Sequence, residues 1–138
     1  MAGYSGTPLV QKLGIKPDAR LHFAAAPPDF ADTLGPLPAG VEQVGGAGKG
    51  LDVAVLFVTA RADLERRFAK LAARLAPAGM LWVAWPKKAS GVATDLTENV
   101  VRDVGLAAGL VDTKVCAVDA VWSGLRFVYR LKDRPGRG

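Results

Sequence analysis

The feature that most constrains this fold is the run LDVAVLFVTA at residues 51–60, which is apolar at nearly every position and rich in β-branched residues. A strand that faces water on one side alternates apolar and polar residues, whereas a strand without alternation is buried on both faces. A second such run, MLWVAW at residues 80–85, follows one helical segment later. We therefore expect two neighbouring parallel strands, around Val55 and Val83, between two layers of helices.

The segments around these runs complete an α/β pattern. Leu64, Phe68, Leu71 and Leu75 recur at helical spacing and predict a helix over 61–77 that ends at Pro77 and Gly79. Before residue 51 we predict a short helix at 7–14 capped by Thr7, a strand at 19–26, a turn and helical turns at 27–35, and an edge strand at 41–44. After residue 85 we predict a helix at 94–109, with Asp95 and Glu98 as a capping box. A hairpin of strands at 111–118 and 125–131 follows, and its tip holds Trp122, Ser123 and Gly124.

This order predicts one three-layer Rossmann-like α/β domain, with a mostly parallel sheet and a C-terminal antiparallel hairpin. The 138 residues suit a single domain. We place that domain at 19–131, after an N-terminal arm and short helix at 1–18 and before a disordered tail at 132–138.

Composition narrows the classes of protein to consider. The net charge of +5 is spread along the chain, which fits a solvated surface or a small anionic ligand, and we do not expect nucleic acid to bind. A single cysteine, Cys116, excludes an intramolecular disulfide, and neither a signal peptide nor an apolar run of membrane-spanning length is evident. We expect a cytoplasmic protein with no membrane contact, and the sequence leaves its oligomeric state open.

Ligands of open α/β sheets bind outside the carboxyl ends of the strands. That rule selects the segments 25–30, 59–63 and 85–91. In the last of them, WPKKASG follows a buried strand, so that Lys87 and Lys88 supply positive charge while Ser90 and the Gly91 amide can donate to an anion. Trp85 and Trp122 complete this predicted ligand site, and the alternative interpretation is a strand-to-helix loop with solvated lysines.

Other motifs argue against familiar chemistry. GGAGKG at residues 45–50 has Gln43 where a P-loop requires its first glycine, and a strand rather than a helix follows it. The first strand is followed by Pro27 and Pro28 instead of glycines, which removes N–H donors that a nucleotide phosphate would need. His22 and Cys116 each lie within a predicted strand without a partner, so we expect neither a metal site nor a nucleophile.

The passage at residues 51–91 resembles the second half of the class I methyltransferase fold, in which an apolar strand, a helix and a turn lead into the next strand. The turn here is Leu75–Ala76–Pro77–Ala78–Gly79, and the hairpin at 111–131 resembles the closing strands of that fold. The segments YSGTPLVQKLGIKP, LWVAWPKKASG and KVCAVDAVWSGLRFV also resemble a family of small bacterial proteins of unknown function. That second resemblance implies a Rossmann-like fold and no activity, cofactor or partner.

Three hypotheses follow. The first, which we favour here, is a non-enzymatic protein that needs no cofactor and holds a small anion near Lys87, Lys88 and Ser90. The second is a divergent methyltransferase that uses residues 25–29 as the binding edge for S-adenosyl-methionine (SAM). The third is a protein-interaction module that makes contact through the N-terminal arm or the hairpin.

Overall fold

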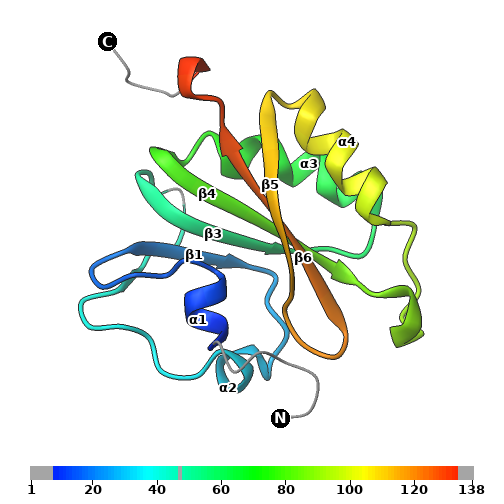
Figure 1. Cartoon of the computed structure of the whole chain (residues 1–138), viewed down its shortest axis with the longest axis horizontal. Coiled ribbons are helices and arrows are strands. Elements are labelled where there is room, and N and C mark those ends of the chain that lie inside the picture. The colour runs from blue at the N-terminus through cyan, green and yellow to red at the C-terminus, as the bar shows by residue number, and fades with distance from the viewer. Residues whose placement is uncertain (1–7, 47, 134–138) are drawn as a thin grey trace.

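A computed structural model describes residues 8–46 and 48–133 of the chain. Its described residues form a sheet of six strands flanked by helices on both faces (Figure 1). In chain order the elements are α1 (Leu9–Lys12), β1 (Arg20–Ala24), α2 (Phe30–Leu34), β2 (Glu42–Gln43), β3 (Leu51–Phe57), α3 (Arg61–Ala72), β4 (Leu75–Pro86), a 3-10 turn (Lys88–Ser90), α4 (Glu98–Ala107), β5 (Leu110–Ala117), β6 (Trp122–Tyr129) and a second 3-10 turn (Leu131–Asp133).

The strand order is β2-β1-β3-β4-β6-β5. The pairs from β2 to β4 are parallel, and β6 runs antiparallel to both of its neighbours. Val55 and Val83 are fully buried in the adjacent parallel strands β3 and β4, which confirms the prediction made from the two apolar runs. The mixed α/β architecture with a C-terminal antiparallel hairpin is likewise confirmed.

Two hydrophobic clusters cover the two faces of the sheet. On one face, α3 and α4 bury Phe68 against Phe127, whose rings meet edge to face with centroids 5.1 Å apart. On the other face, α1, α2 and their loops cover β1, β3 and β4, and the indole Nε1 of Trp82 donates to the carbonyl of Leu13 over 2.9 Å. Residues 8–15 are therefore part of the packed domain.

The structure corrects two predicted boundaries in α3 and the hairpin. The helix predicted at 61–77 ends at Ala72, because residues 75–79 already belong to β4. A Cβ on Gly79 would lie 2.4 Å from the carbonyl oxygen of Leu51, so this bulged part of β4 approaches β3 too closely for any other residue. Trp122, Ser123 and Gly124 lie in β6 rather than at the hairpin tip, because Asp119 closes the turn by accepting from the amides of Val121 and Trp122, each at 2.8 Å.

The start of α4 also differs from the prediction. Thr97 caps this helix by accepting from the amide of Val100, so the helix begins at Glu98 and not at residue 94. The carboxylate of Asp95 instead accepts from the amide of Arg61 over 2.8 Å, at the first residue of α3. Asp95 thus joins the starts of the two long helices, a contact between distant segments that sequence spacing does not reveal. The proposed cap of the first helix, Thr7, lies outside the described residues.

Candidate functional site

The turn after β1 has a strained backbone. Ala25 has a φ of 60°, in the left-handed region that costs a residue with a Cβ about 1 kcal/mol. Pro27 and Pro28 follow, and the carbonyl of Pro27 accepts from the amide of Phe30 at the start of α2. Ala25 therefore adopts a backbone conformation typical of glycine, although it carries a methyl group. Pro27 and Pro28 after it provide no amide donors. Strain of this kind is concentrated at functional sites in proteins.

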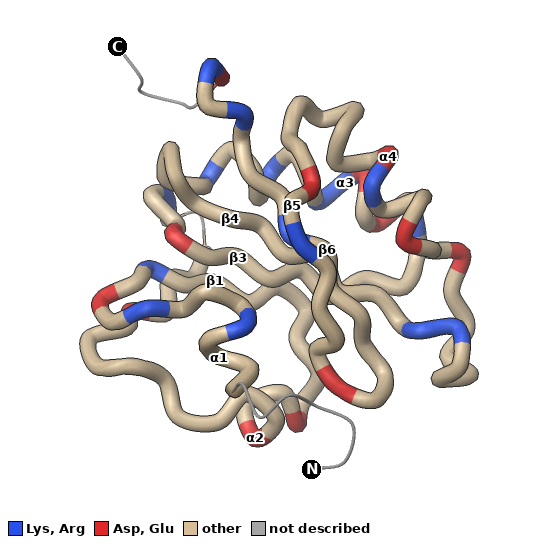
Figure 2. The backbone as a smooth tube through the Cα atoms, viewed as in Figure 1, with Lys and Arg blue, Asp and Glu red and all other residues tan. Residues whose placement is uncertain are grey.

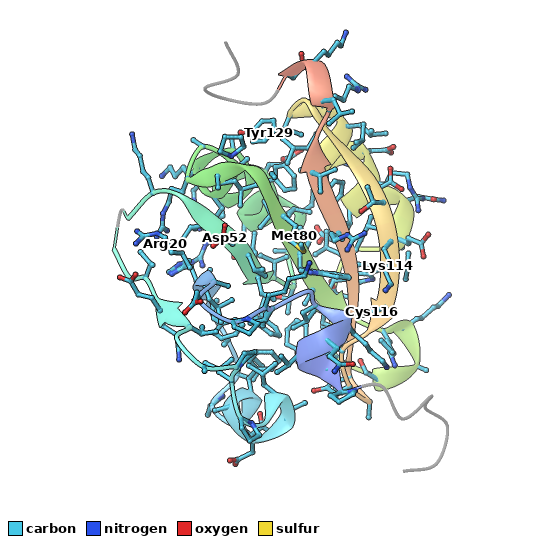
Figure 3. The ribbon with its side chains drawn as sticks, turned by 60° about the vertical axis from the view of Figure 1, so that its left-hand side comes forward. Arg20, Asp52, Met80, Lys114, Cys116 and Tyr129 are labelled. Carbon is cyan, nitrogen blue, oxygen red and sulfur yellow. The ribbon has the colours of Figure 1, made fainter. Side chains whose placement is uncertain are left out.

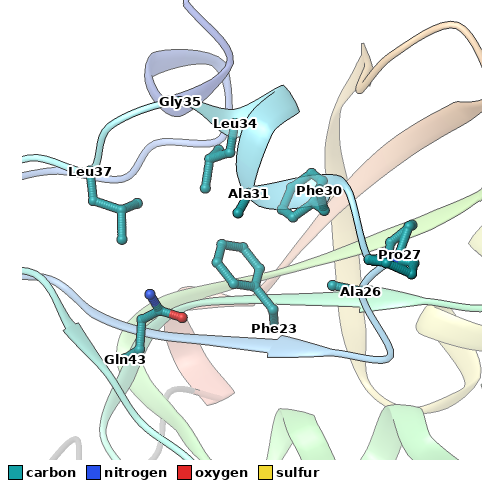
Figure 4. A pocket seen from close by; sticks show the side chains of 10 residues that line it. Phe23, Ala26, Pro27, Phe30, Ala31, Leu34, Gly35, Leu37 and Gln43 are labelled. Atoms are coloured by element: carbon teal, nitrogen blue, oxygen red, sulfur yellow. The ribbon is translucent and has the colours of Figure 1, made fainter.

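A pocket of about 290 Å³ lies between this turn, α2 and the ends of β1 and β2 (Figure 4). The side chain of Phe23 forms its floor, α2 contributes Ala31 and Leu34, and Gln43 approaches from β2. Its full lining is Phe23, Ala26, Pro27, Pro28, Phe30, Ala31, Leu34, Gly35, Leu37 and Gln43. The pocket is therefore apolar, with one amide side chain at the end of β2 that can fix a ligand's orientation.

A row of aromatic rings runs from this pocket along the same face of the sheet. Phe23 meets Phe30 with ring centroids 5.1 Å apart, Phe30 meets Phe57 at 4.8 Å, and Phe57 meets Trp122 at 5.1 Å. All three pairs are edge to face, the arrangement that aromatic quadrupoles prefer. The row joins the start of β6 to the pocket and holds Phe30, the first residue of α2, in place.

The charges beside the pocket are acidic. Asp29 and Asp32 are exposed and adjoin the lining residues Pro28 and Ala31. Asp29 precedes α2 without a side-chain capping bond. Figure 2 shows the corresponding acidic positions at α2. The surroundings of the pocket thus favour a cationic ligand over an anionic one.

The basic loop predicted to hold an anion is occupied by its own hydrogen bonds. The hydroxyl of Ser90 donates to the carbonyl of Lys87 over 2.6 Å, and the amide of Gly91 donates to the carbonyl of Lys88 over 3.4 Å. The amide of Lys87 donates to the carbonyl of Val121 over 2.7 Å. Lys88 is exposed. The two donors expected to meet an anion therefore already serve the 3-10 turn that ends β4.

The structure separates the two tryptophans of the predicted ligand site. Trp85 packs in the cluster beneath α3 and α4, whereas Trp122 packs against the cluster on the α1 and α2 face. Trp85 is paired with Ser123 and Trp122 with Pro86 in the register of β4 and β6, so their side chains leave opposite faces of the sheet. Neither residue lines the pocket.

The other ionisable residues of β1, β5 and the β5–β6 turn have structural contacts. His22 Nδ1 lies 2.7 Å from the carbonyl of Val44, and Asp119 closes the β5–β6 turn. Asp112 accepts from the Arg102 guanidinium over 2.9 Å, and this hydrogen bond lowers the pKa of the carboxyl. Burial raises the pKa of the Cys116 thiol, which makes it a weaker nucleophile.

Sequence reasoning selected the segment 25–30 but missed the walls of the pocket. Leu34, Leu37 and Gln43 lie on a short helix, a connector and a two-residue strand, none of which has a recognisable periodicity. The available signal was the pair of phenylalanines, Phe23 and Phe30, on either side of the Pro27–Pro28 turn. Two large apolar residues that flank a turn at a carboxyl edge are well placed to line a ligand site.

No family model and no curated protein matches the sequence of this chain. A SAM-dependent methyltransferase from Aquifex aeolicus superposes with a TM-score of 0.59 at 12% identity, covering 86% of each chain. This chain has a methyltransferase-like Rossmann fold.

Two further methyltransferase structures superpose on this chain to a similar extent. The precorrin-6y C5,15-methyltransferase of Geobacter metallireducens has a TM-score of 0.59 at 10% identity, covering 88% of this chain and 86% of its own. The magnesium protoporphyrin IX methyltransferase of Synechocystis, solved with bound SAM, has a TM-score of 0.56 at 12% identity, covering 88% of this chain and 74% of its own. At these identities the resemblance concerns the fold.

These similarities contradict our preferred hypothesis of a non-enzymatic protein that holds a small anion beside Lys87, Lys88 and Ser90. The structural neighbours are methyltransferases, and the donors of that loop are already bonded within it. The fold that these structures share is the one that the methyltransferase alternative requires. In the part of the chain that the structure describes, no helix has the length and apolar character needed to cross a bilayer.

Proposed function

We propose that this chain is a divergent methyltransferase that holds SAM in the pocket between α2 and the ends of β1 and β2. The observation that carries the proposal is the pocket's position at the carboxyl end of β1 in a methyltransferase-like fold. Ligands of open α/β sheets bind at this edge. The strained Ala25 at the turn beside the pocket supports the same place.

The residues that line the pocket suit the nucleoside part of this cofactor. Phe23, Phe30 and Leu34 offer apolar surface to a flat purine, and the amide of Gln43 can both donate to and accept from a ribose hydroxyl. The volume of about 290 Å³ is near the lower end of the range of roughly 300–1,000 Å³ found for small-molecule sites. We therefore expect part of the cofactor to extend from the pocket toward the sheet edge.

The chemistry of the turn selects among nucleoside ligands. Pro27 and Pro28 provide no amide donors, so a pyrophosphate would lose the contacts on which dinucleotide sites depend. SAM contains no phosphate and carries a positively charged sulfur. Asp29 and Asp32 beside the pocket would favour that charge. The departure from the glycine pattern therefore opposes a dinucleotide much more strongly than it opposes SAM.

When bound, SAM supplies an electrophilic methyl group that a nucleophilic acceptor can remove. The contribution of this chain would be to hold the reactants in line and to exclude water. The aromatic row from Phe23 to Trp122 provides a rigid, dry wall for that purpose.

Isothermal titration calorimetry tests the cofactor. We expect SAM and S-adenosyl-homocysteine (SAH) to bind in the micromolar range, and NAD to give no heat. Gln43→Ala should weaken both ligands about fivefold, the effect of one lost hydrogen bond. Gln11→Ala, which removes an exposed glutamine of α1, is the matched control. Asp29→Asn should weaken SAM but not SAH, because only SAM carries the sulfonium charge.

Absence of heat with both SAM and SAH would refute the proposal, as would a Gln43→Ala variant that behaves like Gln11→Ala. Catalysis needs a separate measurement. The wild-type protein, mixed with SAM and a bacterial metabolite extract, should form SAH faster than the Gln43→Ala variant does, as followed by mass spectrometry. Equal rates would show that the protein binds the cofactor without using it.

A further inference from the structure

The last strand of the sheet, β5, has one edge with no neighbouring strand among the described residues. It pairs only with β6 in the strand order, and its eight residues make it a long edge strand. Thr113, Lys114 and Val115 are exposed, and Val115 is among the most exposed large apolar residues described, at 46%. A long edge strand of this kind offers main-chain N–H and C=O groups to another extended chain.

Cations gather on one face of this edge. Lys114 is directly opposite Arg126 of β6, so the two side chains leave the same face of the sheet. The Arg126 guanidinium lies 5.8 Å from the ring centroid of Trp82, which belongs to the cluster on the α1 face. Both charges therefore lie on the α1 side. Figure 2 shows these basic positions together on β5 and β6, with the basic end of α1 in the same view.

A third cation comes from α1. Burial raises the pKa of the Cys116 thiol, and the positive charges of Lys12, Lys114 and Arg126 each act against that shift. Lys12 lies in the last turn of α1, which packs on the same face of the sheet as the Trp82 ring beside Arg126. Figure 3 shows Lys114 and Cys116 along the same strand. The nearest acid along β5, Asp112, is paired with Phe127 in the register, and its carboxylate is bound by Arg102 of α4 on the opposite face.

The other face of the strand is apolar at the same level. Val115 is opposite Leu125, a buried residue of the cluster beneath α3 and α4. Successive residues at this edge thus present a positive charge to one side and an exposed apolar side chain to the other. This alternation defines the chemistry of a strand that would fit beside it.

We propose that β5 binds, as an added strand, an extended segment of a partner protein in which acidic and apolar residues alternate. The acidic side chains would meet Lys114, Arg126 and Lys12, and the apolar ones would cover Val115. This inference goes beyond the proposed methyltransferase function, since it concerns a different edge of the sheet and stands whether or not SAM binds.

Charge and shape favour this partner over two others. A second copy of a chain with a net charge of +5 would repel the first, and identical edges would bring Lys114 close to its own counterpart. Single-stranded nucleic acid gains much of its affinity from bases stacked on exposed rings. The ring beneath Arg126, that of Trp82, is fully buried and offers no such platform.

Fluorescence anisotropy with the full chain tests the proposal. The probe is a fluorescein-labelled peptide of four Glu-Val repeats, and a Lys-Val peptide of equal length is its control. We expect only the acidic peptide to bind, with an affinity that falls as salt is added. Lys114→Glu should weaken it about tenfold, whereas Lys70→Glu, a charge reversal on exposed α3, should leave it within about twofold. Circular dichroism confirms that each variant is folded, and Lys114→Gln provides a milder change.

Strand addition has its own control, a Glu-Val peptide N-methylated at alternate residues, which cannot donate to the edge of β5 and should not bind. The proposal is overturned if that peptide binds as well as the unmodified one, or if Lys114→Glu matches Lys70→Glu. It is also overturned if an oligouridine RNA binds more tightly than the acidic peptide in a Lys114-dependent manner.

Discussion

The two halves of the sheet are built differently. In the half formed by β3, β4, β6 and β5, the covering helices α3 and α4 have 12 and 10 residues, and Phe68 and Phe127 are fully enclosed between the layers. In the half formed by β1 and β2, the neighbouring helix α2 has five residues, β2 has only two, and a pocket opens beside Phe30. The first half therefore holds the fold together, while the second keeps space for a ligand and bears the strained turn.

The largest expected effect compares a phenylalanine from each half. Phe68→Ala should lower the free energy of unfolding by about 4 kcal/mol, because it leaves a cavity among fully packed neighbours. Phe30→Ala should cost about 2–3 kcal/mol, since this ring already borders empty space. Urea unfolding followed by circular dichroism measures both values.

The conservative variants Phe68→Leu and Phe30→Leu serve as controls for loss of the aromatic contacts alone. If Phe30→Ala costs as much as Phe68→Ala, the two halves are equally well packed and the contrast between them fails.

The second prediction concerns close packing in the stable half. A Cβ on Gly105 of α4 would lie 2.0 Å from an atom of the Phe127 ring. Gly105→Ala should therefore destabilise the protein by about 2–3 kcal/mol, despite alanine's higher helix propensity. The matched control is Gly45→Ala in a loop, where a Cβ would meet nothing within 4 Å, and its midpoint of urea unfolding should be nearly unchanged. If Gly105→Ala leaves the free energy of unfolding unchanged, α4 can move away from β6 at little energetic cost.

The structure of the stable half could be predicted from the sequence because its hydrophobic patterns extend over many residues. Residues 51–57 and 80–85 lack any alternation, and Leu64, Phe68 and Leu71 recur at helical spacing, so burial on both faces of the strands follows directly. The errors lie where a tertiary contact overrides a local signal. Pro77 and Gly79 indicate the end of a helix, yet the close approach of Leu51 draws them into β4.

The pocket could not be predicted in the same way. Its walls come from elements of two to five residues, too short to show periodicity, and it forms only when Gln43 and Leu37 return to the end of β1. An anion site was predicted at Lys87 and Lys88 because charged residues can be recognised in a sequence. The hydrogen bonds that occupy Ser90 and Gly91 are not visible there, since they depend on the local 3-10 turn.

The third prediction sharpens the contrast at the strained turn. Ala25→Gly should stabilise the protein by about 0.5–1 kcal/mol, because glycine adopts a φ of 60° without the Cβ penalty. The greater conformational entropy of glycine in the unfolded chain offsets part of this gain. Thermal unfolding measures the gain. Ala26→Gly, one residue further along the same turn, controls for the entropic effect and should be neutral or destabilising. A destabilised Ala25→Gly would show that the turn carries no strain.

The smallest expected effect lies on the α4 side of β5, at the contact between Arg102 and Asp112. The hydrogen bond from Arg102 lowers the pKa of Asp112 below its ordinary value of 3.8, so the charged carboxylate favours the folded state. The full stabilisation is present when the pH lies above 3.8, the ordinary pKa of the carboxyl. It is lost as the pH falls through the lowered pKa of Asp112 in the folded protein. Because both side chains are partly exposed, with 28% of each accessible, the effect should be smaller than that of Ala25→Gly and should weaken in salt.

A double-mutant cycle of Asp112→Asn and Arg102→Gln, measured by urea unfolding at pH 7, 4 and 2.5, isolates this contact. The coupling between the two positions should be positive at pH 7 and should shrink at pH 2.5, where the carboxyl is increasingly protonated. A coupling that does not change with pH would mean that packing, rather than charge, joins α4 to β5. The register with Phe127 would still keep Asp112 on the α4 face, so the chemistry proposed for the β5 edge does not depend on this charge.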